Sequence, residues 1–123
     1  MHNTKKSFAR SDRIASQIQR ELAIVLRTNL DDPRIAWITL TRVTVTRDYA
    51  LARVYYTVMD ENTRVATAEA LTCAARHLRA ELSRRISMFT TPQLQFIYDE
   101  SVERGARISQ LINQFAQPGS QIT

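Results

Sequence analysis

This sequence contains few side chains of catalytic types at the spacing that a catalytic site requires. The closest approach to a catalytic pair is Asp31 and Asp32, two adjacent carboxylates directly before Pro33. General acid–base catalysis requires carboxyl groups that face one substrate in a pocket. An acidic pair before proline is instead typical of a turn that ends a helix. We therefore interpret Asp31 and Asp32 as turn residues.

The cysteine and the histidines do not predict a nucleophilic or metal site either. Cys73 stands beside Ala74 and Ala75, a setting that favours a small buried thiol over a nucleophile. His77 lacks a set of nearby ligands at metal-binding spacing, and His2 stands apart from it. We expect no catalytic residue, no metal, no cofactor and no small-molecule substrate, and hence no enzyme.

Glycine and cysteine counts exclude further classes of function. The two glycines, Gly105 and Gly119, are fourteen positions apart, whereas phosphate-binding loops and dinucleotide fingerprints need several glycines in close register. One cysteine cannot form an internal disulfide or a multi-thiolate zinc site, which suits a reducing cytosol. The longest apolar run has five residues, too few to span a membrane. We expect a cytoplasmic protein.

The basic side chains give a stronger signal. The 123-residue chain has 17 Lys and Arg, fifteen of them Arg, against 12 Asp and Glu, a net charge of +5. Residues 1–20 have a net charge of +4 and residues 74–87 have +3, so the remainder is −2. Arginine forks suit phosphate oxygens, although a solvated helix face is the alternative interpretation. The candidate RNA-binding residues are Lys5, Lys6, Arg10, Arg13, Arg20, Arg76, Arg79, Arg84 and Arg85.

The first predicted element that positions these residues is a helix. Residues 1–10 are polar and basic without apolar periodicity, which predicts a flexible arm. Ser11 and Asp12 are typical helix caps, and apolar residues then recur at helical spacing up to Leu26. Pro33 ends this pattern.

Two strands follow, in residues 36–46 and 51–59, and they predict an antiparallel hairpin with its turn at residues 47–49. The apolar phase changes inside the first strand, which indicates a β-bulge near Thr41 and Arg42.

The remaining pattern predicts a helix over residues 63–87, a strand over 94–98 and a helix from Ser101, with a loose tail over 117–123. Acidic residues at the start of the last helix, Asp99, Glu100 and Glu103, complement its dipole. The whole pattern favours a single α+β domain, with a three-stranded sheet packed on one face by helices.

Several short motifs, in order, resemble the bacterial ribosome-binding factor A family. They cover the chain from about Arg10 to Phe115, and their combination is much more specific than any one of them. The motifs are Asp32-Pro33-Arg34, Thr44-Val45-Thr46-Arg47-Asp48, Val54-Tyr55-Tyr56-Thr57-Val58 and the segment from Pro92 to Gly105.

The resemblance implies a type II KH-like RNA-binding domain over residues 11–116, ordered helix–strand–strand–helix–kink–helix–strand, with a C-terminal helix added. It implies a non-catalytic assembly factor, a cytoplasmic monomer, that binds the free small (30S) ribosomal subunit and its 16S rRNA. It further implies a role in late maturation and 5′-end processing of 16S rRNA, and in adaptation to cold. A general nucleic-acid binder and a protein-interaction adaptor remain the alternatives.

One departure from the family pattern concerns its helix kink, which an Ala-x-Gly motif marks. The matching residues here are Ala74, Ala75 and Arg76, so arginine replaces the glycine. The resemblance implies that the long helix splits here, and the glycine's absence predicts a gentler or shifted break. We expect Arg76 to contact phosphate.

Overall fold

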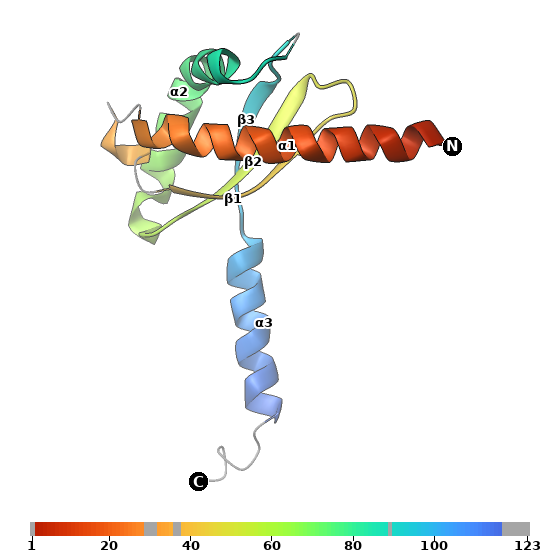
Figure 1. The fold of residues 1–123 in the computed structure, drawn as a ribbon. Coiled ribbons are helices and arrows are strands. Elements are labelled where there is room, and N and C mark those ends of the chain that lie inside the picture. Colours follow the sequence, from red (N-terminus) through yellow and green to blue (C-terminus); the bar gives the residue numbers. More distant parts are fainter. Residues whose placement is uncertain (1, 29–31, 36–37, 89, 117–123) are drawn as a thin grey trace.

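The computed structural model describes residues 2–28, 32–35, 38–88 and 90–116 (Figure 1). Within these residues, three strands and three α-helices, with two short 3₁₀ turns, confirm the predicted α+β class. In chain order the elements are α1 (His2–Thr28), η1 (Pro33–Ile35), β1 (Ile38–Val45), β2 (Leu51–Val58), η2 (Glu61–Thr63), α2 (Arg64–Arg85), β3 (Gln93–Tyr98) and α3 (Ser101–Ala116).

The sheet has the order β1-β2-β3. β1 pairs with β2 in antiparallel register, and the register shifts between Leu40 and Arg42, which confirms the predicted bulge. In the hairpin turn, the Tyr49 amide donates to the Thr46 carbonyl over 2.9 Å, and Tyr49 has a φ of 58°. β3 pairs with β2 in parallel, and a parallel neighbour requires a crossover, which α2 provides.

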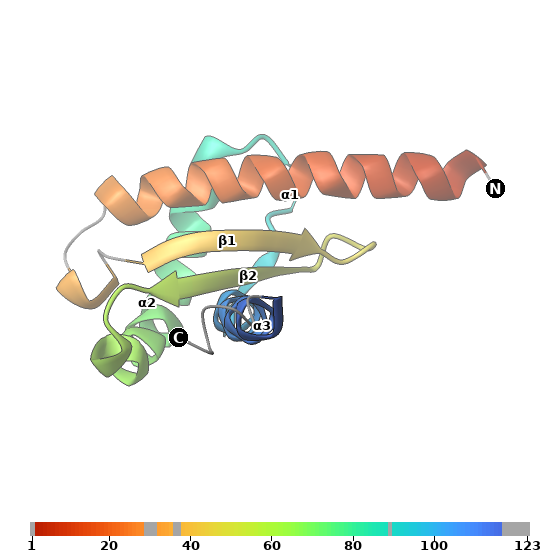
Figure 2. The ribbon, with the colours of Figure 1, turned by 90° about the horizontal axis from the view of Figure 1, so that it is seen from below.

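The core lies between one face of the sheet and the helices α1 and α2. Alternate residues of β2 enter it, namely Ala52, Val54 and Tyr56, all at most 2% exposed. The rings of Phe96 and Tyr98 meet Tyr56 edge to face. The helices contribute fully buried leucines and isoleucine: Ile18, Leu22, Leu71, Leu78 and Leu82. Figure 2 shows α1 running along β1 and β2. The predicted packing of helices on one face of the sheet is therefore confirmed.

Helix α1 begins at His2, so residues 2–10, for which an irregular flexible arm was expected, are helical. Ser11 and Asp12, the expected caps, lie inside the helix, where Ser11 is buried and Asp12 is exposed. Helix growth is cooperative once a turn is formed, so the packed part of α1 can extend into a polar segment. Figure 1 shows this end of α1 extending past the sheet. Residues 117–123, the expected tail, lie outside the described residues.

Helix α2 is one continuous helix from Arg64 to Arg85, so the expected break is a gentle one that does not divide it into two helices. In Figure 1 its ribbon changes direction between the green first part and the teal last part. Among the described residues other than glycine, a positive φ occurs at Tyr49 and not at Arg76. Arg76 therefore has the backbone conformation of a right-handed helix. Arginine is a good helix former and lacks the freedom of glycine, which explains why helical hydrogen bonding continues through this position.

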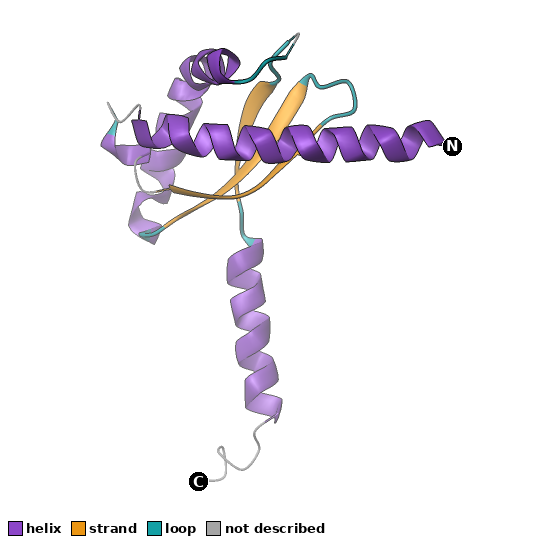
Figure 3. Cartoon of the chain, in the orientation of Figure 1, coloured by secondary structure: helices purple, strands orange, loops and turns teal. Residues whose placement is uncertain are grey.

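Helix α3 leaves the end of β3 and projects away from the rest of the protein (Figures 1 and 3). Its predicted apolar residues Ile108, Leu111 and Ile112 are between 54% and 58% exposed. The helix is thus amphipathic as predicted, but these three side chains are not part of the core.

Asp99 links the start of α3 to the sheet. Its carboxylate accepts hydrogen bonds from the Ser101 amide, over 2.9 Å, and from the hydroxyls of Ser101 and Thr41. These bonds, led by those from Ser101 and then Thr41, lower the pKa of Asp99 to about 2. Asp99 therefore caps α3 and ties it to the bulge in β1, a more specific role than the predicted dipole interaction.

Replacing Asp99 with alanine is expected to lower the free energy of unfolding by about 1–3 kcal/mol at pH 7, because a helix cap and a buried acceptor are lost. The folded-state pKa lies below the ordinary value of 3.8. The carboxylate's contribution is therefore present above that value and lost as pH falls toward about 2. Urea unfolding at both pH values measures the difference, with Asp12→Ala as an exposed control. An equal Asp99→Ala deficit at pH 7 and pH 2 would contradict this linkage.

Candidate nucleic-acid interface

Helix α1 presents a row of arginines on the side away from its buried residues. We call Arg10, Arg13, Arg20 and Arg27 the basic stripe; all four are exposed. Successive members are three or seven residues apart, a spacing that places side chains on one side of an α-helix. The buried side chains of α1, such as Ile18 and Leu22, fix this orientation because they attach the opposite side to the sheet.

The stripe contains three predicted residues and one that the sequence interpretation missed. Arg27 follows Arg20 by seven residues, as Arg20 follows Arg13, so its spacing could have identified it. Lys5 and Lys6, also predicted, belong to α1, but their side chains lie outside the described part of the structure.

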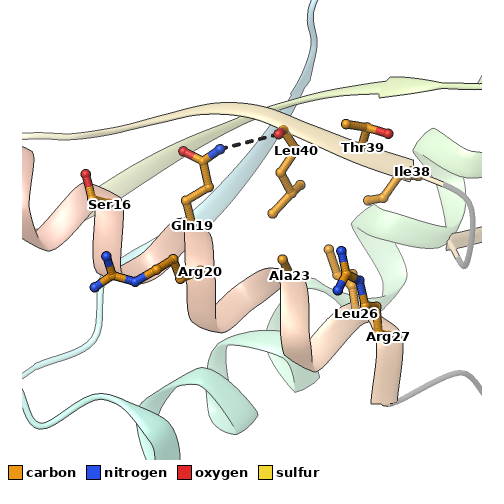
Figure 4. A pocket seen from close by; sticks show the side chains of 9 residues that line it. All are labelled: Ser16, Gln19, Arg20, Ala23, Leu26, Arg27, Ile38, Thr39 and Leu40. Carbon is orange, nitrogen blue, oxygen red and sulfur yellow. Dashed lines mark hydrogen bonds between the residues drawn. The ribbon is translucent and has the colours of Figure 1, made fainter.

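A groove runs beside the basic stripe, between α1 and β1, with a volume of about 480 Å³. Arg20 and Arg27 line it from the helix, and the strand contributes Thr39 and Leu40 (Figure 4). The Gln19 side-chain amide donates to the Leu40 carbonyl over 3.3 Å and bridges the two elements. Two guanidinium groups at a mixed polar and apolar groove can bind the phosphate backbone of a polynucleotide.

The four predicted arginines of α2 differ in their surroundings. Arg79 donates two hydrogen bonds to the Thr91 carbonyl, over 3.0 and 2.8 Å, and so holds the loop before β3. Arg84 pairs with Glu81 within the helix. Arg85 pairs with Glu21 of α1 over 2.7 Å, which places the end of α2 beside the C-terminal half of α1. The structure therefore gives Arg79 and Arg85 structural partners that the sequence did not reveal.

Arg76 is exposed and lines a shallow hollow of about 410 Å³ together with Arg79, Ser83 and Met88. Within the described residues, no ion pair or hydrogen bond is assigned to its guanidinium. Among the four arginines of α2, Arg76 is therefore the best placed for an external anion.

Arg79→Met and Arg76→Met form a matched pair that compares an arginine with an internal hydrogen-bond partner and an exposed arginine. Arg79→Met is expected to lower the free energy of unfolding by about 1–3 kcal/mol, because the buried Thr91 carbonyl loses its donors. Arg76→Met should change it by less than about 0.5 kcal/mol, since its side chain is exposed. Urea denaturation followed by circular dichroism measures both, and equal losses would contradict the assignment.

The residues considered for catalysis are placed as follows. Asp32 accepts hydrogen bonds from the Arg34 amide and guanidinium, and the guanidinium lowers the pKa of Asp32. This confirms a turn role for Asp32, whereas Asp31 lies outside the described residues. Cys73 is exposed, so the predicted burial is wrong. The reason is that the helix face it shares is not covered: Glu69 and His77, four residues to either side, are also exposed.

Metal sites and membrane-spanning helices are not found in the part of the chain that the structure describes. No group of three or more His, Cys, Asp or Glu side chains there is arranged to hold a metal ion. No helix formed by these residues combines the length and the apolar character that crossing a membrane requires.

Comparison with known proteins identifies relatives along nearly the whole chain. The sequence profile of a family described as Ribosome-binding factor A matches residues 10–112. A protein named Ribosome-binding factor A from Chromobacterium violaceum is 60% identical over 117 residues, which cover 95% of this chain and 85% of that protein.

Two structures of ribosome-binding factor A have a similar fold. The crystal structure of ribosome-binding factor A from Thermus thermophilus has a TM-score of 0.64 and 31% sequence identity, and the match covers 72% of this chain and 94% of that one. A homology model of the Thermus thermophilus protein, fitted into a cryo-EM map of a 30S complex, has a TM-score of 0.58 and 31% identity, and covers 70% of this chain and 91% of that one.

Proposed function

Because the chain belongs to the ribosome-binding factor A family, we propose that it binds the free small ribosomal subunit in the bacterial cytoplasm and contacts 16S rRNA. It acts without catalysing a reaction and as a monomer. Within that role it assists late maturation and 5′-end processing of 16S rRNA, with particular importance in the cold. The family resemblance supports this finer role.

The basic stripe of α1 is the observation that carries the proposal. Four exposed arginines follow one side of a helix and two of them line a groove, an arrangement that suits a phosphate backbone. The related Thermus thermophilus protein has been fitted into a map of a 30S complex, which supports the small subunit as the source of that backbone.

We narrow the predicted set of contact residues according to the partners that each side chain has. The proposed phosphate-binding set is the basic stripe with Arg76 and Arg84, together with Lys5 and Lys6 from the first turns of α1. Arg79 and Arg85, which were predicted to bind RNA, have partners outside α2 in Thr91 and Glu21, whereas the partner of Arg84, Glu81, lies in the same helix. We assign Arg79 and Arg85 to positioning α2 and the loop that follows it rather than to the rRNA contact itself.

Sedimentation of a bacterial lysate through a sucrose gradient tests the proposed function. The protein should migrate with free small subunits and be absent from joined ribosomes. In cells that lack it, small subunits should contain 16S rRNA with an unprocessed 5′ end, most of all at low temperature. A protein that stays in the light fractions, with normal 16S rRNA in its absence, would contradict the proposal.

A protein-interaction adaptor remains a second candidate, favoured by the exposed apolar side chains of α3. Ile108, Leu111 and Ile112 lie on one side of this helix at helical spacing and are more than half exposed. An adaptor would still bind its partner in nuclease-treated extract, whereas an rRNA-binding factor would lose its association with the subunit. A general nucleic-acid binder would not distinguish small subunits from random duplex DNA.

A further inference from the structure

The face of the sheet opposite the core carries an aromatic and basic surface. We call it the outer face and define it by two rows of paired residues. In one row Arg42 pairs with Tyr55, and Tyr55 with Ile97. In the next, Thr44 pairs with Arg53, and Arg53 with Gln95. Because side chains alternate along a strand, these six lie on the side away from the buried Val54 and Tyr56.

The outer face is accessible in the described structure. Arg42, Arg53 and Gln95 are exposed, and Tyr55 and Ile97 are half-buried. Since α1 and α2 pack on the other face, neither covers these rows. A polynucleotide strand can therefore reach the two exposed guanidinium groups, one of which lies over the half-buried Tyr55 ring.

The chemistry of the outer face is defined by one contact. The Arg42 guanidinium carbon lies 4.3 Å from the centre of the Tyr55 ring, which places a cation over an aromatic face. Both a tyrosine ring and a guanidinium plane can stack against an unpaired nucleobase. Asp99, the carboxylate near Arg42, is buried and hydrogen-bonded to Thr41 and Ser101, so it is not presented to a ligand.

We propose that the outer face binds single-stranded RNA, with an unpaired base stacked on Tyr55 and Arg42 and a neighbouring phosphate bound by Arg53. The inference rests on the proposed rRNA-binding function and adds a second surface to it. Bases in a duplex are paired and stacked, so this surface discriminates single strands from duplexes. The basic stripe, in contrast, is expected to bind the phosphates of either form.

The composition of the outer face favours RNA over a protein partner. The centre of a protein-docking surface is rich in apolar side chains and poor in charges. Of the six outer-face residues, one is aliphatic, Ile97, and two are arginines. The most exposed large apolar side chains of the described chain lie elsewhere, at Met59 and Val65 and on α3.

Fluorescence anisotropy with a labelled single-stranded RNA of about ten nucleotides, and with the duplex of the same sequence, tests the inference. Tyr55→Leu should weaken binding of the single strand by about 5- to 150-fold, the effect of one lost stacking contact, and leave duplex binding unchanged. Tyr55→Phe retains the ring and should bind as the wild type does. If Tyr55→Leu does not fold, the exposed pair Arg42→Gln and Arg53→Gln is tested with the same two probes and the same expected contrast.

The outcomes separate this inference from the proposed function. If Tyr55→Leu binds the single strand normally, or weakens both probes equally, the outer face is not a stacking surface. The same conclusion holds for the arginine pair if it is used. The double variant Arg13→Gln and Arg20→Gln, measured on intact small subunits, tests the proposed function independently. If this double variant binds small subunits as tightly as the wild type, the basic stripe is not the rRNA-binding surface. That conclusion does not depend on the result for Tyr55→Leu.

Discussion

Replacing Arg13 and Arg20 together with glutamine is expected to weaken binding to the free small subunit by about 25- to 60-fold at about 0.1 M salt. Both side chains are exposed members of the basic stripe. Each phosphate contact releases about 0.7–0.9 of a condensed counterion. At that salt concentration, release from two contacts corresponds to about 1.4–1.8 logarithmic units of affinity.

The salt dependence of binding supplies a second measurement of the same variant. With six to eight phosphate contacts, the logarithm of the wild-type affinity should fall with the logarithm of salt at a slope of about −4 to −7. The slope of the double variant should be less steep by about 1.4–1.8. Titration of small subunits with labelled protein at several salt concentrations measures both quantities.

A charge-matched control lies outside the stripe. Arg47, in the hairpin turn, and Arg104, on α3, are both exposed, and replacing them with glutamine removes the same net charge. Because exposed charges are screened beyond about 10 Å at 0.1 M salt, this control should bind within about twofold of the wild type. An equal loss in both double variants would show that general charge, rather than the basic stripe, determines affinity.

Much of the sheet could be predicted from the sequence, because the alternation of apolar residues within each strand shows which side chains are buried. The period-two pattern of β2 places Ala52, Val54 and Tyr56 in the core, as alternation requires. The change of phase in β1 indicated a bulge, which the register shift between Leu40 and Arg42 confirms. In both strands, the apolar pattern alone shows which side of the sheet is buried.

The start of α1 could not be predicted in the same way. Residues 1–10 have no apolar periodicity, and the signal for a helix there comes from the packed residues that follow. Ser11 shows the ambiguity, because a serine typical of a helix cap is instead buried inside the helix. Local propensity cannot distinguish these roles when tertiary packing decides where a helix extends.

The candidate interface was predicted only in part, because the role of an arginine depends on distant partners. Arg85 pairs with Glu21, 64 residues away in the chain, and Arg79 bonds to Thr91 across twelve residues. Charge counts cannot reveal these contacts, so both arginines were included with Arg76 among the candidate RNA-binding residues. Arg27 was omitted for another reason: it lies outside the segment of high net charge, although its helical spacing continues the row.

Leu22→Ala is expected to lower the free energy of unfolding by about 2–5 kcal/mol, the range for removing a buried leucine side chain. Leu22 has no exposed surface and belongs to the core formed with Ile18 and the sheet. Because proteins of this size are stable by only about 5–15 kcal/mol, the loss is a large fraction of the total. Urea unfolding followed by circular dichroism measures it.

Ile24→Ala provides the control for Leu22→Ala within the same helix. Ile24 is 37% exposed and lies on the stripe side of α1, so its truncation should cost less than about 1 kcal/mol. The comparison tests how the stripe is positioned, since Leu22 attaches α1 to the sheet and thereby fixes the direction of Arg13 and Arg20. As temperature rises, the Leu22→Ala protein should therefore unfold and stop binding the subunit, whereas the Ile24→Ala protein should stay folded and bound. Equal stability of the two variants would show that α1 does not depend on the sheet for its position.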